Sequence, residues 1–262
     1  MFRTFALTAL LLAVSSAAQA ACTDAPGPGV VWQKCDKGGL RMAGTDLQGA
    51  RIEQTDLSGT DLARANLADA MLALSDISRA RLADATLRAA DLTKVDADRT
   101  DLRRADLRRA TMSKIDLTRG DLTEARLDGA RIDKADFSRA VLVAASLSDA
   151  DLSKTDLGRA DLTGAILTGA RLSEADFGRA VLRDADLGGS NLSEANLHLA
   201  DLRGAVLTDA DLNRAILRDT RIEGVDLGGT ANVTQRQLDE ACGDAATVLP
   251  EGLVRPSHWP CG

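Results

Sequence analysis

Few side chains in this 262-residue chain are suited to covalent chemistry. The chain has two histidines, His198 and His258, no tyrosine and four cysteines. No serine lies in a nucleophile-elbow sequence, and neither a glycine-rich phosphate loop nor an H-E-x-x-H zinc motif occurs. We therefore expect a protein that is not an enzyme and that needs no cofactor or catalytic metal.

The most regular charged residues are aspartates and arginines that recur every twenty residues. Six Asp-x-x-Arg pairs form this candidate surface ladder: Asp76 with Arg79, Asp96 with Arg99, Asp116 with Arg119, Asp136 with Arg139, Asp156 with Arg159, and Asp176 with Arg179. If the chain winds into twenty-residue coils, the carboxylates stack at about one strand spacing and could bind cations or imitate a phosphate backbone. The alternative, which we favour, is that the arginines stack beside them and the two columns screen each other as exposed ion pairs worth about 0–1 kcal/mol each.

The element that positions these residues is a five-residue repeat without insertions from Leu40 to Gly229. Counted from Leu40, the third position of each pentad is large and apolar except at Ala97, and the first position is small in nearly all pentads. On an extended chain, residues two apart point to the same side, so both positions face the interior. On a helix, a step of five residues rotates by about 140° and would scatter the leucines around the axis. The pattern therefore predicts short extended segments joined by turns.

The twenty-residue period over a five-residue repeat predicts four sides to each coil. Lysines share this period at Lys94, Lys114, Lys134 and Lys154. The A-(D/N)-L-x-x units resemble those of the pentapeptide-repeat family over residues 40–229. This resemblance implies an all-β fold, a right-handed quadrilateral β-helix, here of about 9–10 coils that bury their apolar sides by stacking. Leucine and alanine columns would fill its interior and leave no substrate cavity.

The N-terminal residues 1–20 have the pattern of a cleavable secretory signal. Arg3 precedes an apolar run, and Ala18-Gln19-Ala20 provides a small-residue cleavage site. The apolar run is too short to span a bilayer, so we expect no transmembrane segment in the mature chain. An uncleaved anchor or an acylated Cys22 is the alternative. We expect export to the periplasm or the cell exterior.

Export predicts that the four cysteines form disulfides. Cys22 and Cys35 precede the repeats, whereas Cys242 and Cys261 follow them. A rod of this many coils is roughly 45 Å long, and a disulfide tolerates only about 7 Å between Cα atoms. We therefore expect Cys22 to pair with Cys35 and Cys242 with Cys261. Zinc binding is the rival, but neither pair has C-x-x-C spacing and the two pairs are too far apart to meet.

Caps are expected at both ends, because the terminal coils would otherwise expose leucines and unpaired edges. Residues 21–39 are predicted to form the N-terminal cap, with Val30-Val31-Trp32 covering the first coil. Residues 230–262 are predicted to form the C-terminal cap. There Thr234 is suited to begin a short helix from Gln235 to Ala241.

Three residues bear on how the ends of the rod are covered. Leu238 in the predicted helix is expected to cover the last coil. Trp32 and Trp259, near the two caps, could seal the core or form an end-to-end contact between molecules. The oligomeric state is therefore open.

The charge composition limits the choice of partner. The formal net charge is −7, but 32 lysines and arginines are interspersed with the acids, and no basic surface bearing aromatic residues is evident. Direct nucleic-acid binding is therefore not expected. We expect a non-enzymatic structural or protein-interaction scaffold in the bacterial envelope or secreted, with an unknown protein partner. The resemblance also implies an alternative, a DNA mimic that binds DNA gyrase, which export would oppose. A cation-binding envelope protein is a third hypothesis.

Overall fold

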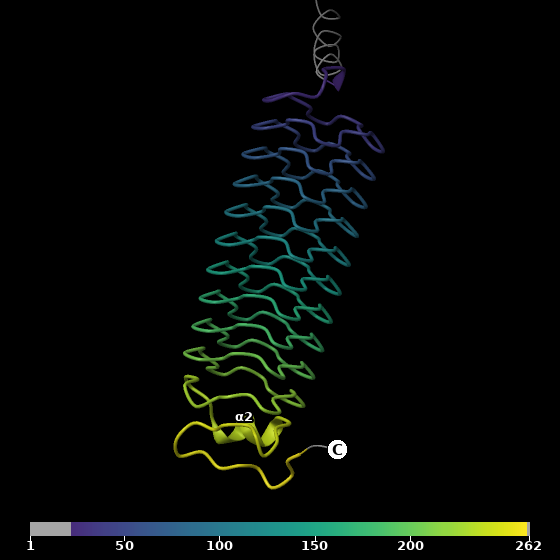
Figure 1. Ribbon diagram of the computed structural model, residues 1–262. Helices are drawn as coiled ribbons and strands as arrows, with labels where there is room; N and C mark the ends of the chain where they lie inside the picture. The colour runs from purple at the N-terminus through teal and green to yellow at the C-terminus, as the bar shows by residue number, and fades with distance from the viewer. Residues whose placement is uncertain (1–21, 261–262) are drawn as a thin grey trace, which may run out of the picture.

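The computed structural model describes residues 22–260 and shows an elongated stack of similar coils (Figure 1). Its first and last described residues lie at opposite ends of the stack. The predicted signal, residues 1–20, lies outside the described residues. Within residues 22–260, no helix is long and apolar enough to cross a membrane.

Each coil contains twenty residues. Parallel single-residue bridges join almost every second-position residue to the residue twenty later, from Val31 with Arg51 to Asp211 with Ala231; Val206 is the exception. The bridged coils thus begin at Val31, ahead of Leu40. Four pentads complete one coil, so the stack has four faces, as the twenty-residue period predicts. Along the described chain the strands are reduced to these isolated bridges.

The pentads are joined by turns with one repeated geometry. The N–H at position 1 donates to the carbonyl at position 3 of the preceding pentad, as from Ala80 to Ile77 at 2.9 Å. Position 5 has a positive φ from Lys34 to Gly224, for example 56° at Arg79 and 60° at Arg139. A turn in which only the third residue has a positive φ is of type II. From Lys34 to Gly224, no β-branched residue occupies position 5, because such side chains are poorly tolerated there.

The core consists of the side chains at positions 1 and 3. Leu62, Leu127 and Leu167 are fully buried, as are almost all their equivalents. At several first positions a buried hydroxyl donates to the preceding coil: Thr100 to the Ile77 carbonyl at 2.8 Å, and Thr155 to the Ile132 carbonyl at 2.9 Å. Thr60 donates within its own turn, and the Ser190 hydroxyl is buried without a hydrogen-bond partner among the described residues. The interior is therefore filled by side chains, and most of its few polar groups are hydrogen-bonded.

Helix α2 (Gln235–Glu240) covers the C-terminal end of the stack (Figure 1). Thr234 is its N-cap, as the sequence predicts, and it also forms a capping box with Gln237. Leu238 is fully buried, and the Gln237 side chain donates to the carbonyls of Leu212 at 2.8 Å and Ala215 at 3.0 Å. The helix is thus fastened to the coil beneath it.

The chain after α2 completes the last coil. Arg221 bridges Cys242, and Asp226 bridges Val248, so these faces are covered by a further strand segment. The Trp259 indole donates to the Ala241 carbonyl at 2.7 Å and is 9% exposed. In this chain, Trp259 therefore seals the end of the core.

Candidate functional site

The six predicted aspartates stack in register on one face, and we call Asp76, Asp96, Asp116, Asp136, Asp156 and Asp176 the Asp column. Each bridges the next, and the column continues to Asn196. The twenty-residue period in the sequence therefore correctly predicted a column of carboxylates. Adjacent carboxylates are separated by about 4.8 Å along the rod, the spacing of paired strands.

Each carboxylate of the Asp column also stabilises the turn that follows it by accepting a hydrogen bond. An Asp Oδ1 accepts the N–H two residues later: from Ser78 to Asp76 at 2.7 Å, and from Ser138 to Asp136 at 2.8 Å. The same bond recurs on the other faces wherever Asp or Asn stands at position 2, as at Asn191. This Asx turn explains why these residue types recur there. Sequence analysis missed this role, although Asp or Asn two residues before a turn residue is its signal.

The hydrogen bonds and the geometry of the Asp column do not indicate a metal site. At Asp56, one coil before the column, hydrogen bonds from the side chain and backbone of Ser58 lower the pKa of the carboxyl. Over residues 22–260, no group of three or more His, Cys, Asp or Glu side chains is placed to hold a metal ion. The carboxylates are thus arranged in a line instead of converging on one point.

The arginines also stack, and we call Arg79, Arg99, Arg119, Arg139, Arg159 and Arg179 the Arg column. Their backbone N–H groups donate to position 4 of the next coil, as from Arg139 to Gly158 at 2.9 Å. No ion pair within 4.0 Å joins an Asp of the Asp column to the Arg three residues later. Arg119 instead pairs with Asp98 at 2.8 Å. The expected pairwise screening within each pentad is therefore not formed.

A shallow groove of about 530 Å³ runs between the two columns. Asp156 and Asp176 lie on one side, and Arg119, Arg139, Arg159 and Arg179 lie on the other. Position 4 forms its floor and carries no side chain at Gly158 and Gly178. We call this feature the Asp–Arg groove. It has walls of opposite charge and a floor that is partly bare backbone.

The most buried ion cluster lies on a different face. Asp201 is 8% exposed and accepts hydrogen bonds from Arg183 at 2.6 Å and from Arg203 at 2.7 Å. Burial raises the pKa of Asp201, but the hydrogen bonds from Arg203 and Arg183 outweigh it and hold the pKa well below its ordinary value. Sequence analysis missed this cluster. The sequence signal for this cluster is an arginine at position 4 of the same face in two successive coils, here Arg183 and Arg203.

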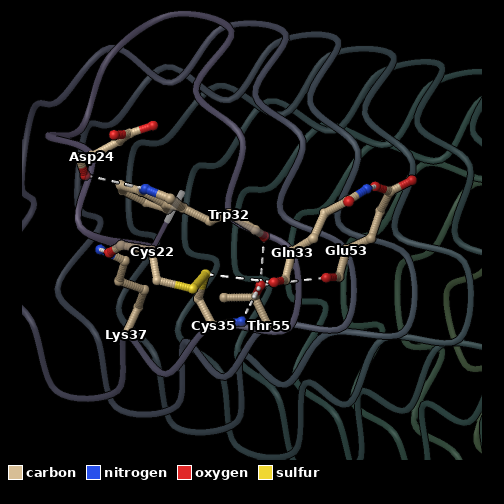
Figure 2. Close-up of a disulfide and its surroundings, with 8 residues drawn as sticks. All are labelled: Cys22, Asp24, Trp32, Gln33, Cys35, Lys37, Glu53 and Thr55. Carbon is tan, nitrogen blue, oxygen red and sulfur yellow. Dashed lines mark hydrogen bonds between the residues drawn. A yellow bond between two sulfur atoms is a disulfide. The ribbon is translucent and has the colours of Figure 1, made fainter. Parts of the chain in front are cut away.

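The N-terminal end is fastened by the predicted disulfide between Cys22 and Cys35, whose Cα atoms are 5.5 Å apart (Figure 2). Lys37 Nζ donates to the Cys22 carbonyl at 2.6 Å and lies 4.3 Å from the centre of the Trp32 ring. The Trp32 indole donates to the Asp24 carbonyl at 3.2 Å and the residue is fully buried. Trp32 therefore seals this end of the core.

The second predicted disulfide involves Cys242 and Cys261. Cys242 lies on the strand segment that bridges Arg221. Cys261 lies outside the described residues, so this pairing stays a prediction.

The sequence profile described as Pentapeptide repeats matches the chain in 8 copies, from residues 41–79 to residues 195–230. This chain belongs to the pentapeptide-repeat family. The right-handed, four-sided β-helix of that family agrees with the twenty-residue coils. No curated protein matches the sequence.

Solved pentapeptide-repeat structures resemble this family member to different extents. HetL, a pentapeptide repeat protein involved in heterocyst differentiation regulation from the cyanobacterium Nostoc sp. strain PCC 7120, is 33% identical with a TM-score of 0.59. The match covers 73% of this chain and 86% of HetL. Rfr23 from the cyanobacterium Cyanothece 51142 is 38% identical over 36% of this chain and 62% of its own, with a TM-score of 0.33.

A more distant match is QnrB1, a plasmid-mediated fluoroquinolone resistance protein. It is 18% identical over 82% of this chain and 94% of its own, with a TM-score of 0.36. These values are too low to transfer a function to the present pentapeptide-repeat protein.

Proposed function

We propose that this protein is a non-enzymatic, exported scaffold whose outer faces bind another protein. The observation that carries the proposal is that some positions of each pentad face the core while the others face the solvent. Positions 1 and 3 are buried in the core, whereas positions 2, 4 and 5 carry mostly charged and polar side chains in columns along the rod, with exposed apolar exceptions such as Met71 and Ile166. A rigid rod with columns of fixed chemistry suits binding by surface complementarity.

Two observations support export. Residues 1–20 have the sequence pattern of a secretory signal. The Cys22–Cys35 disulfide joins the N-terminal segment to the first coil, and such bonds persist mainly in oxidising compartments.

The gyrase-binding DNA mimic is less well supported. Such a surface requires uncompensated carboxylates, but the Arg column lies in register beside the Asp column. The cation-binding hypothesis is likewise weakened, because within residues 22–260 no three His, Cys, Asp or Glu side chains converge on one point.

In-cell photocrosslinking tests the scaffold function. A photoreactive phenylalanine analogue would be placed singly at four exposed fifth positions of one coil, one on each face: Arg139, Ala144, Asp149 and Lys154. We expect one face to crosslink repeatedly to a single envelope or extracellular protein while the opposite face does not. Crosslinks from no face, or equal crosslinks from all four, would contradict a specific scaffold.

Intact mass of protein from the fractionated native host tests export. We expect a chain that begins at Ala21, gains mass only after reduction and alkylation, and is found outside the cytoplasm. A full-length, reduced cytoplasmic protein would contradict export. Inhibition of DNA gyrase by that protein would then favour the mimic.

A further inference from the structure

We propose that the Asp–Arg groove binds an extended protein segment whose side chains alternate between acidic and basic residues. The proposal rests on the scaffold function and names the class of partner and the surface that receives it. The segment lies along the rod axis, with its acidic side chains against the Arg column and its basic side chains against the Asp column.

The arginines that form the basic wall have guanidinium donors available to a partner. Arg139, Arg159 and Arg179 follow one another in successive coils, and none forms an ion pair within 4.0 Å in residues 22–260. Each guanidinium carries five N–H donors in a planar fork suited to a carboxylate. Arginines stacked at about 4.8 Å repel one another, and carboxylates of a partner relieve that repulsion.

The acidic wall also retains an acceptor. Asp156 Oδ1 accepts the Gly158 N–H at 2.7 Å, and Asp176 Oδ1 accepts the Gly178 N–H at 2.8 Å. Asn196 also donates to Asp176 Oδ1, at 2.9 Å. These bonds leave the Oδ2 atoms of both aspartates for a lysine or arginine of the partner.

The floor admits the backbone of a partner. Gly158 and Gly178 do not have a positive φ, so the turn itself does not require glycine there, and Ser138 occupies the equivalent position. A Cβ at Gly158 would lie 2.9 Å from Asp156 Oδ1, and one at Gly178 would lie 3.0 Å from Asp176 Oδ1. Glycine therefore keeps the floor bare and leaves the acidic wall undisturbed.

The length of the groove matches that of an extended segment of about five residues. Three coil steps separate Arg119 from Arg179, which is about 14 Å at the usual strand spacing. In an extended segment, three successive side chains on the same side span about 13 Å, and the intervening side chains point to the opposite side. Alternating charges would therefore place acids and bases on opposite walls. A nucleic acid or an acidic polysaccharide carries one sign of charge only and would meet repulsion from the Asp column.

Peptide binding measured by fluorescence anisotropy tests this assignment. The probes are three labelled octapeptides: alternating Glu-Lys, a block of four Glu followed by four Lys, and eight Glu. We expect the alternating peptide to bind at least about tenfold more tightly than the block peptide, with an affinity that falls as salt rises.

Two variants separate the walls. The triple variant Arg139→Gln, Arg159→Gln, Arg179→Gln keeps the turn, because Gln54 natively occupies position 5 with a φ of 54°. We expect it to weaken alternating-peptide binding by at least about tenfold. The variant Asp156→Asn, Asp176→Asn keeps the Asx turns, as Asn191 does. We expect it to weaken the alternating peptide while strengthening the all-Glu peptide.

A matched control changes the same net charge elsewhere. Arg64, Arg88 and Arg109 are not ion-paired within residues 22–260, and none of them lines the groove. Their replacement by Gln should alter binding less than about twofold. Unchanged thermal unfolding would verify that all variants are folded.

Several results would overturn the proposal. These are equal weakening by the groove and control variants, an all-Glu peptide that binds as tightly as the alternating one, or no saturable binding below about 1 mM at low salt. A partner crosslinked from another face would then retain the scaffold function while removing the groove as its site.

Discussion

At the scale of single residues, the first role of each aspartate at position 2 is to stabilise its own turn. The Oδ1 of Asp136 accepts the Ser138 N–H at 2.8 Å, and equivalent bonds recur at other second positions. The twenty-residue columns are therefore partly a consequence of a local backbone requirement. Surface function must be sought in what remains, namely the second carboxylate oxygen and the residues at positions 4 and 5.

The Asx turn predicts a difference between two substitutions at one site. Asp136→Ala should lower the free energy of unfolding by about 1 kcal/mol, because a turn N–H loses its acceptor. Asp136→Asn should change it by less than about half that amount, since the amide oxygen accepts the same bond. Urea denaturation of the two variants measures both. Equal losses would assign the effect to charge instead of to the turn.

The buried Asp201 cluster predicts a dependence on pH. The pKa of Asp201 is lower in the folded protein than its ordinary value, so its contribution is complete above about pH 4 and is lost as the pH falls further. Asp201→Asn should therefore cost about 1–3 kcal/mol at pH 7.

The cost of Asp201→Asn should shrink progressively below about pH 4. The measurement is urea denaturation of wild type and variant across this range. Asp226→Asn is the control, because Asp226 caps its turn at Gly228 without an arginine partner within 4.0 Å in the described chain. A cost that is the same at every pH would contradict the assignment.

A third residue-scale prediction concerns the one small residue at position 3. Ala97 is buried, and Val95 and Ile115 at nearby first positions are buried and larger than the usual alanine. We expect them to fill the volume that Ala97 leaves. Ile115→Ala should lower the free energy of unfolding by about 2–5 kcal/mol. A loss below about 0.5 kcal/mol would show that Ile115 does not serve this purpose.

At the scale of elements, α2 replaces a pentad on the face that it covers. The Asp219 N–H donates to the Glu240 carbonyl at 2.7 Å, where a further coil would otherwise accept it. Helix α2 therefore covers the apolar core of the last coil and also accepts a hydrogen bond from its backbone.

The end of the cap predicts a steric effect. A Cβ at Gly243 would lie 2.4 Å from the ring of Trp259. Gly243→Ala should therefore displace Trp259 and destabilise the cap by about 1–3 kcal/mol. Tryptophan fluorescence should report greater exposure before global unfolding. Gly252→Ala is not a suitable control because Gly252 has a φ of 82°, whereas Gly27, which has open space around it, is suitable.

The repeating elements could be predicted from sequence, but their side-chain partners could not. Leucine spacing determined which residues face inward, and Thr234 marked the start of α2. The ion pairs depend on rotamers of long side chains, and Arg119 contacts Asp98 although Asp116 is closer in sequence. The Asp201 cluster similarly depends on two arginines that lie on the same face only once the coils are stacked.

At the scale of the whole molecule, the rod is nearly one-dimensional. Each coil contacts only its neighbours, so stability is approximately a sum of coil and interface contributions. The ends have one neighbour fewer, and this explains the concentration of Trp32, the Cys22–Cys35 disulfide and α2 at the two ends.

The disulfide predicts a local effect at the N-terminal end. Cys22→Ser with Cys35→Ser should destabilise the first coil by about 3 kcal/mol in the chain-entropy model. Hydrogen exchange should rise in residues 22–49 and stay unchanged near Leu127. Uniformly faster exchange along the rod would instead indicate that the coils unfold as one unit.

The bridges between residues twenty apart also constrain how the gene can change length. Duplication of twenty residues adds one coil and leaves every downstream column aligned, so the rod grows by about 4.8 Å with its surface preserved. Insertion of a single pentad keeps the core pattern intact but turns everything downstream by one face. The Arg column would then continue on a different side of the molecule. Changes in length by whole coils thus conserve a long binding surface, while changes by single pentads create new combinations of charges.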